Sequence, residues 1–155
     1  MVAQVSRVAF GGISVLDVDA GAETNRTVIT FVGAPDAVVA GAFQLIGKAA
    51  ELIDMSVQTG AHARHGATDV CPFVPVSGVT MDDCAELAAR LGARVGEELG
   101  IPVFLYEHAA KLPERRSLAA VRAGEYEALP DKLARPEWKP DFGPASFLPR
   151  TGVVT

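Results

Sequence analysis

Basic residues are in short supply in this chain of 155 residues. The chain has 14 Lys and Arg residues but 19 Asp and Glu residues, which gives a net charge of −5 and an isoelectric point near 5.1. Proteins that bind DNA or RNA present a basic face, because attraction to phosphates supplies much of their affinity. The composition therefore argues against a nucleic-acid partner, while a small anion held by one or two arginines remains compatible with it.

The sequence also has no long uninterrupted apolar run and no recognisable export signal. The most apolar stretch, residues 37–53, is broken by Gln44, Lys48 and Glu51, so it does not resemble a membrane span. The first ten residues contain one arginine and no apolar core followed by a cleavage site. We therefore expect a cytoplasmic protein without a membrane partner.

Cysteine is scarce, with only Cys71 and Cys84 in the chain. Cys71 lies in an expected strand, and Cys84 lies on the apolar face of an expected helix. Without an export signal, two such residues are expected to be free, buried thiols rather than a disulfide.

Hydrophobic residues make up 49% of the chain and charged residues 21%, which is typical of one soluble domain with a real core. Runs of β-branched residues predict strands, and apolar residues at helical spacing predict helices. In order, the pattern predicts strands at 13–18 and 26–32, a helix from 35 to about 54, a strand at 69–76, a helix at 80–99 and a strand at 102–106. This order indicates an α+β fold, a ferredoxin-like α/β sandwich whose small mixed sheet has helices packed mainly on one face.

The ends of the chain differ in character from its middle. Residues 1–12 are weakly patterned and compatible with the frayed end of a helix. Residues 109–134 are predicted to be helical in pieces, with their interleaved charges forming a solvated face. Residues 130–155 read as an extended, proline-rich tail that is ordered, because Trp138, Phe142 and Phe147 need burial.

One stretch, Gly60 to Pro75, concentrates the residues with reactive side chains. His62 or His65 could act as a general acid or base, since imidazole titrates near neutral pH. The H-x-x-H spacing, with Asp69 and Cys71 downstream, could also hold a metal, although zinc needs three or four converging ligands. A histidine in a surface loop without a role is the third interpretation, and spacing alone favours it.

Other candidates are scattered along the chain. Asp19 lies at a strand end, where it could orient a cationic group or simply form a turn. Arg64 and Arg122 could bind carboxylates or be surface charges. The segment from Gly143 to Gly152 could bind a ring or strap the domain as a tail; its residues are Gly143, Pro144, Ala145, Ser146, Phe147, Leu148, Pro149, Arg150, Thr151 and Gly152.

Several long blocks carry a specific resemblance. The blocks LDVDAGAETNRTVITFVG, HARHGATDVCPFVPVSGVTMDDC, RAGEYEALP and PDFGPASFLP occur in this order. From about residue 13 onward, the chain closely resembles the N-terminal subdomain of the catalytic unit of glutamate formimidoyltransferase. That family transfers a formimino group from N-formimino-L-glutamate to N5 of tetrahydrofolate in histidine degradation, one part of one-carbon metabolism.

The resemblance assigns roles to residues of this chain. It implies that His62 is the acid/base, that Asp19 lies near the formimino group, and that Gly143 to Gly152 contact folate. Arg64, which could bind a carboxylate, is a further candidate binding residue. The resemblance also implies a homodimer, tetrahydrofolate as co-substrate and no metal in this step.

Three departures from the family pattern qualify these roles. Ala63 replaces the proline that usually follows the catalytic histidine, and His65 replaces an apolar residue. Residues 1–12 correspond to a remnant of an incomplete N-terminal element, and the tail leads toward a second subdomain that this chain does not contain. A partner chain would then supply that subdomain; the alternative is a non-catalytic remnant that binds folate or protein.

Overall fold

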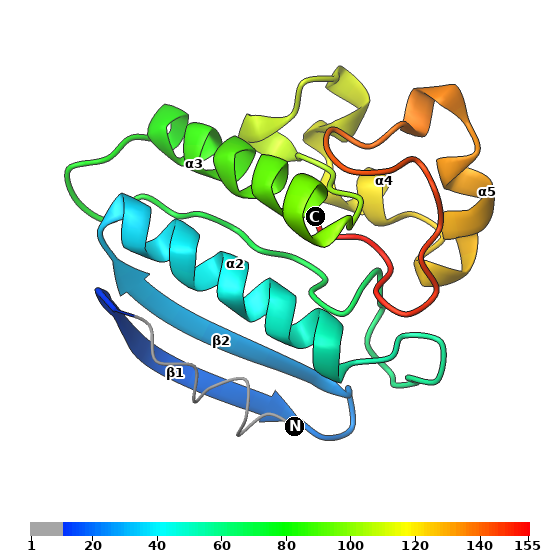
Figure 1. Ribbon diagram of the computed structural model, residues 1–155, viewed down its shortest axis with the longest axis horizontal. Coiled ribbons are helices and arrows are strands. Elements are labelled where there is room, and N and C mark those ends of the chain that lie inside the picture. Colours follow the sequence, from blue (N-terminus) through cyan, green and yellow to red (C-terminus); the bar gives the residue numbers. More distant parts are fainter. Residues whose placement is uncertain (1–10) are drawn as a thin grey trace.

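The computed structural model describes residues 11–155, and its first element is a two-stranded antiparallel hairpin (Figure 1). Strand β1 (Ile13–Gly21) pairs with β2 (Arg26–Gly33), with a bulge between Val15 and Asp17. Both strands were expected from the sequence, although β1 is longer than predicted. The helix remnant predicted for residues 1–12 lies outside the described residues, except for a turn at Gly11 and Gly12.

Two long helices follow, as the apolar spacing predicts. Helix α2 (Pro35–Leu52) begins at a proline, which suits a first helical turn, and it covers one face of the hairpin (Figure 1). Helix α3 (Met81–Arg94) begins with a capping box between Thr80 and Asp83. It continues as a π-helical turn (Val95–Leu99) and ends at Gly100, whose φ of 66° suits glycine.

The strands predicted at 69–76 and 102–106 are wrong as ladder strands, because these segments are extended but pair at only a few residues. Thr155 N donates to Asp69 O at 3.1 Å, and Cys71 N donates to Thr155 O at 2.9 Å. On the other side of the C-terminal segment, Phe104 N donates to Val154 O at 3.0 Å. Four short segments therefore lie side by side: residues 65–71, 151–155, 102–104 and 141–142.

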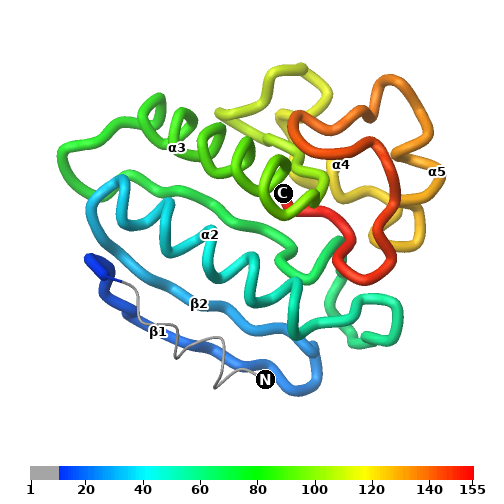
Figure 2. The backbone as a smooth tube through the Cα atoms, viewed as in Figure 1, coloured from blue at the N-terminus to red at the C-terminus, as the bar shows by residue number. Residues whose placement is uncertain are grey.

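These segments separate two apolar cores. Adjacent residues of an extended chain point to opposite faces, and Val153 and Val154 accordingly belong to different clusters. The first core lies against α2 and α3, and the second lies against the short helices of the C-terminal third. Figure 2 shows the C-terminal end of the chain in the middle of the molecule, between these two layers. The prediction of an α+β fold is confirmed.

The C-terminal third is helical in short pieces, as predicted. These are 3₁₀ turns Glu107–Ala109, Pro113–Arg116, Tyr126–Ala128 and Pro136–Trp138, with α4 (Leu118–Arg122) and α5 (Leu129–Leu133). The tail is ordered, and Trp138, Phe142 and Phe147 are each partly buried. None of the described helices is long and apolar enough to cross a membrane.

The prediction of a fully solvated charged face is wrong at two residues, Arg115 and Lys132, which are both buried. Arg115 pairs with Asp141 at 2.7 Å and donates to the Lys139 carbonyl at 2.6 Å. Lys132 donates to backbone carbonyls at the end of α4. A buried cation is tolerated when such partners replace water, and the charge pattern alone does not reveal them.

Both cysteines are free thiols, as expected. Cys84 is buried and Cys71 is half-buried. Burial raises the pKa of the Cys71 thiol to about 11. A thiol in that state is protonated at neutral pH and is a poor nucleophile.

Candidate active site

The loop that carries His62 is fastened to the tip of the β1–β2 hairpin. Asn25 donates its amide to Gln58 Oε1 and to the Thr59 carbonyl, both at 2.8 Å. Gly60 lies against the same turn, where a Cβ atom would come within 2.6 Å of the Thr24 carbonyl oxygen. Only a glycine lets the loop and the hairpin approach so closely, and this contact places the following His62 beside the start of β2.

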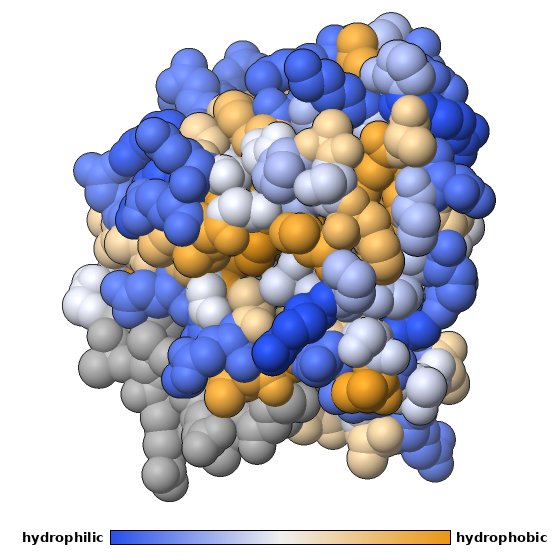
Figure 3. All heavy atoms as spheres, turned by 45° about the vertical axis from the view of Figure 1, so that its right-hand side comes forward, coloured by the Kyte–Doolittle hydropathy of each residue, from blue (hydrophilic) through white to orange (hydrophobic). Residues whose placement is uncertain are grey.

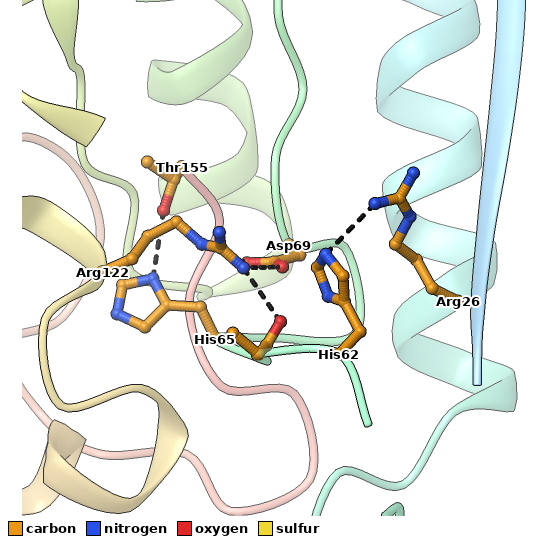
Figure 4. A network of polar contacts seen from close by, with 7 residues as sticks. Arg26, His62, His65, Asp69, Arg122 and Thr155 are labelled. Carbon is orange, nitrogen blue, oxygen red and sulfur yellow. Dashed lines mark hydrogen bonds and ion pairs between the residues drawn. The ribbon is translucent and has the colours of Figure 1, made fainter. Parts of the chain in front are cut away.

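His62 is half-buried and contacts Arg26, the first residue of β2 (Figure 4). The Arg26 Nη1 atom lies 3.1 Å from His62 Nε2. A guanidinium has no acceptor, so Nε2 must be the acceptor in this contact, and a neutral ring then carries its proton on Nδ1. The contact fixes both the tautomer and the orientation of the imidazole.

A partly buried ion pair supports the other end of the loop. Arg122 donates to both oxygens of Asp69, at 2.5 and 3.2 Å, and to the carbonyl of Ala63 at 2.9 Å. Burial raises the pKa of the Asp69 carboxyl, while the positive charges of Arg122 and Arg26 oppose that rise. Arg122 therefore holds the backbone directly after His62, and the surface-charge interpretation of Arg122 is wrong.

The two histidines of the H-x-x-H motif have separate surroundings (Figure 4). His65 is fully buried, and its Nδ1 atom lies 3.1 Å from the Thr155 hydroxyl. Burial lowers the pKa of His65 to about 3, and the charges of Lys132 and Arg122 act in the same direction. Residues 11–155 contain no group of three or more His, Cys, Asp or Glu side chains arranged to hold a metal ion.

Arg64 is joined to the proline-rich tail through Tyr126. Its guanidinium lies 4.6 Å from the centre of the Tyr126 ring, donates to the Met55 carbonyl at 2.8 Å and pairs with Glu127. Tyr126 donates its hydroxyl to the Pro149 carbonyl at 2.6 Å, and its ring meets Phe147 edge-on at 5.3 Å. The histidine loop and the tail are thus brought together.

Asp19 is exposed to solvent, whereas part of the tail is half-buried. Asp19 is exposed on β1, opposite Val28, and no described hydrogen bond joins it to His62. Arg26 is two residues before Val28 on the same strand, so Asp19 and Arg26 occupy the same face of the hairpin. In the tail, Phe147 and Leu148 are half-buried while Ser146 and Arg150 are exposed.

Sequence reasoning missed Arg26 and Tyr126 as residues of this site. Tyr126 lies in RAGEYEALP, the same block that contains Arg122, and the length of that block was a signal that its residues act together. Arg26 is the first residue of β2, directly after the hairpin turn, and its position in the sequence gave no sign of contact with His62, 36 residues away.

An apolar groove of about 250 Å³ lies elsewhere, under α3. Its walls include Cys71, Phe73, Cys84, Tyr106 and Thr155, and no residue of the loop 60–66 lines it. His62 therefore lies outside this groove.

Comparison with known proteins agrees with the motif resemblance. The family described as "Formiminotransferase domain, N-terminal subdomain" matches residues 1–155. The formimidoyltransferase-cyclodeaminase of Gallus gallus is 60% identical over 143 residues, which are 92% of this chain and 26% of that protein. The glutamate formimidoyltransferase of Streptococcus pyogenes serotype M1 is 46% identical over 143 residues, 92% of this chain and 48% of that protein.

A third relative, the glutamate formimidoyltransferase of Thermoplasma acidophilum, is 50% identical over 135 residues, covering 86% of this chain and 45% of that protein. The chain thus spans between a quarter and a half of the length of these relatives. Because the family match extends over the whole sequence, the chain belongs to the formiminotransferase family, as its N-terminal subdomain.

Proposed function

We propose that this chain provides the acid/base half of a glutamate formimidoyltransferase site. The reaction transfers a formimino group from N-formimino-L-glutamate to N5 of tetrahydrofolate. The observation that carries the proposal is His62 itself, an imidazole held in one orientation by Arg26 and by a loop fastened at both ends. A positioned imidazole on an accessible surface is what proton transfer at neutral pH requires.

The proposed reaction moves one proton from the attacking nitrogen to the leaving nitrogen by way of His62. Tetrahydrofolate supplies the amine nucleophile. A bond forms between this nitrogen and the amidine carbon, and the bond from that carbon to the glutamate nitrogen breaks. His62 accepts the proton that the attacking nitrogen loses and delivers it to the departing glutamate nitrogen. The Asp19 carboxylate pairs with the positively charged formimino group, and holding both substrates in place supplies much of the rate.

The tail has features that suit a folate. Phe147 offers a half-buried aromatic face beside Tyr126, and an aromatic face stacks well on a flat ring. Gly143 and Gly152 both have positive φ, so the backbone turns sharply at each end of the segment. Residues 143–152 are therefore proposed to hold the co-substrate next to the Arg64 side of the histidine loop.

The rest of the cleft is proposed to come from additional polypeptide, because the relatives are longer than this chain. A partner chain carrying the second subdomain would complete the site. A homodimer remains a prediction from the family resemblance, and a cytoplasmic location remains a prediction from the absence of a recognisable export signal.

The proposal is tested by mixing the purified chain with a separately produced second subdomain and measuring formimino transfer. His62→Ala should reduce the rate by about a hundredfold or more, the usual contribution of a general acid/base. His108→Ala is the matched control, because His108 is an exposed histidine paired with Asp82. Folate binding without transfer in every combination would instead favour the non-catalytic folate-binding alternative.

A further inference from the structure

Arg26 has more hydrogen-bonding capacity than the structure uses. The one side-chain hydrogen bond described for Arg26 runs from Nη1 to His62 Nε2, whereas a guanidinium has five N–H donors. The side chain is exposed at the start of β2, beside His62 (Figure 4), so its unused donors can be reached from outside the protein. Such a fork of donors matches a carboxylate in two parallel hydrogen bonds.

The other arginines around this loop are already paired with carboxylates. Arg122 binds Asp69, Arg64 binds Glu127, and Arg150 lies 3.7 Å from Asp54. Among these four arginines of the described chain, Arg26 alone has a neutral ring, that of His62, as its hydrogen-bond partner instead of a carboxylate. A guanidinium next to a reactive imidazole and without its own carboxylate is suited to receive one from outside.

The contact also occupies the atom that a base needs. His62 Nε2 must present a lone pair to accept a proton, and in this structure that lone pair receives the N–H of Arg26. The tautomer that Arg26 selects is thus the correct one for a base at Nε2, but Nε2 is not free. Something must draw Arg26 away before His62 can exchange a proton there.

We infer that Arg26 is the receptor for a carboxylate of the acidic donor substrate, and that binding this carboxylate releases His62 Nε2 for proton transfer. The inference rests on the proposed function and names the substrate feature that the site recognises, a dicarboxylic amino acid. A pair between two full charges is stronger than a hydrogen bond from a guanidinium to a neutral ring. The substrate therefore removes the block on the base only when it carries the carboxylate.

The test uses the chain alone, labelled with ¹⁵N in its histidines, and L-glutamate as the probe. In the free protein the His62 Nε2 resonance should be that of an unprotonated nitrogen accepting a hydrogen bond. L-Glutamate should shift it toward a free lone pair, and L-glutamate dimethyl ester, which has no carboxylate, should not. In Arg26→Gln the shift should be absent and glutamate binding at least about tenfold weaker, the usual loss for a hydrogen bond to a charged group.

Two further variants sharpen the result. Arg116→Gln removes an exposed arginine outside the site and should behave like the unmodified chain. His62→Ala should still bind L-glutamate, because the receptor is Arg26. Unchanged glutamate affinity in Arg26→Gln, an equal response to the dimethyl ester, or no response at millimolar glutamate would each overturn the inference.

This experiment separates the inference from the proposed function. A glutamate response that depends on Arg26, without formimino transfer when the second subdomain is added, would leave the carboxylate receptor standing and refute the transferase. Transfer that depends on His62 but does not change in Arg26→Gln would support the transferase and refute the carboxylate receptor. In the active mixture, Arg26→Gln should raise KM for the acidic donor and leave KM for folate unchanged.

Discussion

At the scale of single residues, three positions of sequence separate a surface histidine from a core histidine. His62 faces Arg26 at the surface, whereas His65 lies fully buried against Phe104 with its Nε2 atom unpartnered among the described residues. The residue type therefore carries no fixed role, and the surroundings decide it. Two predictions follow from the buried partners, one for His65 and one for Lys132.

His65→Met should make the protein less sensitive to mild acid. The pKa of His65 falls from 6.5 to about 3 on folding. Below pH 6.5, His65 therefore binds a proton in the unfolded chain but not in the folded chain. Stability is therefore lost as pH falls through that window, by about 2 kcal/mol between pH 7 and pH 5. Urea unfolding of His65→Met at those two pH values should show a correspondingly smaller loss, with His108→Met as the exposed control. Equal pH sensitivity in the two variants would contradict the assignment.

Lys132→Met should be strongly destabilising although it replaces a charge with an apolar chain of similar length. The Lys132 ammonium donates to the carbonyls of Ala120, Val121 and Ala123 and lies 4.0 Å from the centre of the Trp138 ring. Removing it leaves buried carbonyls without a donor, which costs roughly 1–3 kcal/mol. Denaturant unfolding measures the loss. Lys139→Met, at an exposed lysine, should be nearly neutral, and similar losses in both variants would refute this role.

At the scale of elements, the hairpin and the histidine loop behave as one unit. The hairpin turn binds the loop through Asn25, and Gly60 permits the close approach. Gly60→Ala would place a Cβ atom within 2.6 Å of the Thr24 carbonyl oxygen and 2.8 Å of Asn25 Cβ. These atoms cannot move aside as a flexible side-chain end could, so the loop must shift away from β2.

Gly60→Ala should therefore separate His62 from Arg26 and cost about 1–3 kcal/mol of stability. The histidine ¹⁵N spectrum should show His62 Nε2 released in the free protein, and denaturant unfolding should show the loss. Gly11→Ala is the control, because no atom of residues 11–155 lies within 4 Å of its added Cβ. An unchanged His62 resonance would show that the glycine is not needed for the contact.

The elements also show where sequence reasoning succeeds. Local patterns predicted the hairpin, α2 and α3, because the signals for these elements are contained within each segment: runs of β-branched residues and apolar residues at helical spacing. The segments 69–76 and 102–106 were predicted to be strands because extended chain is also a local property. Their partners are residues 141–142 and 151–155, and this long-range pairing has no local signal. The Arg26–His62 contact was missed for the same reason.

At the scale of the whole molecule, the extended segment 72–76 presents an edge to which no other described segment is hydrogen-bonded. Cys71, Phe73 and Pro75 are half-buried, while Val74 and Val76 alternate with them and are 73% and 78% exposed. No backbone group of residues 72–76 bonds another described residue. On the face shown in Figure 3, apolar side chains also form a band between polar regions. Exposed apolar edges with unpaired backbone groups favour pairing with another chain.

We therefore expect residues 72–76 to mediate self-association of the isolated chain, with a second copy pairing along this edge. Val74→Lys combined with Val76→Lys places charge on the exposed side of the segment and should shift the chain toward monomer, because charged edges resist pairing. Sedimentation over a concentration series measures the shift, and the free energy of unfolding should change by no more than about 0.5 kcal/mol because both side chains are exposed. Val57→Lys, at a valine that is 71% exposed outside this segment, is the control. Association that persists in the double variant, or that Val57→Lys abolishes equally, would place the contact on another surface.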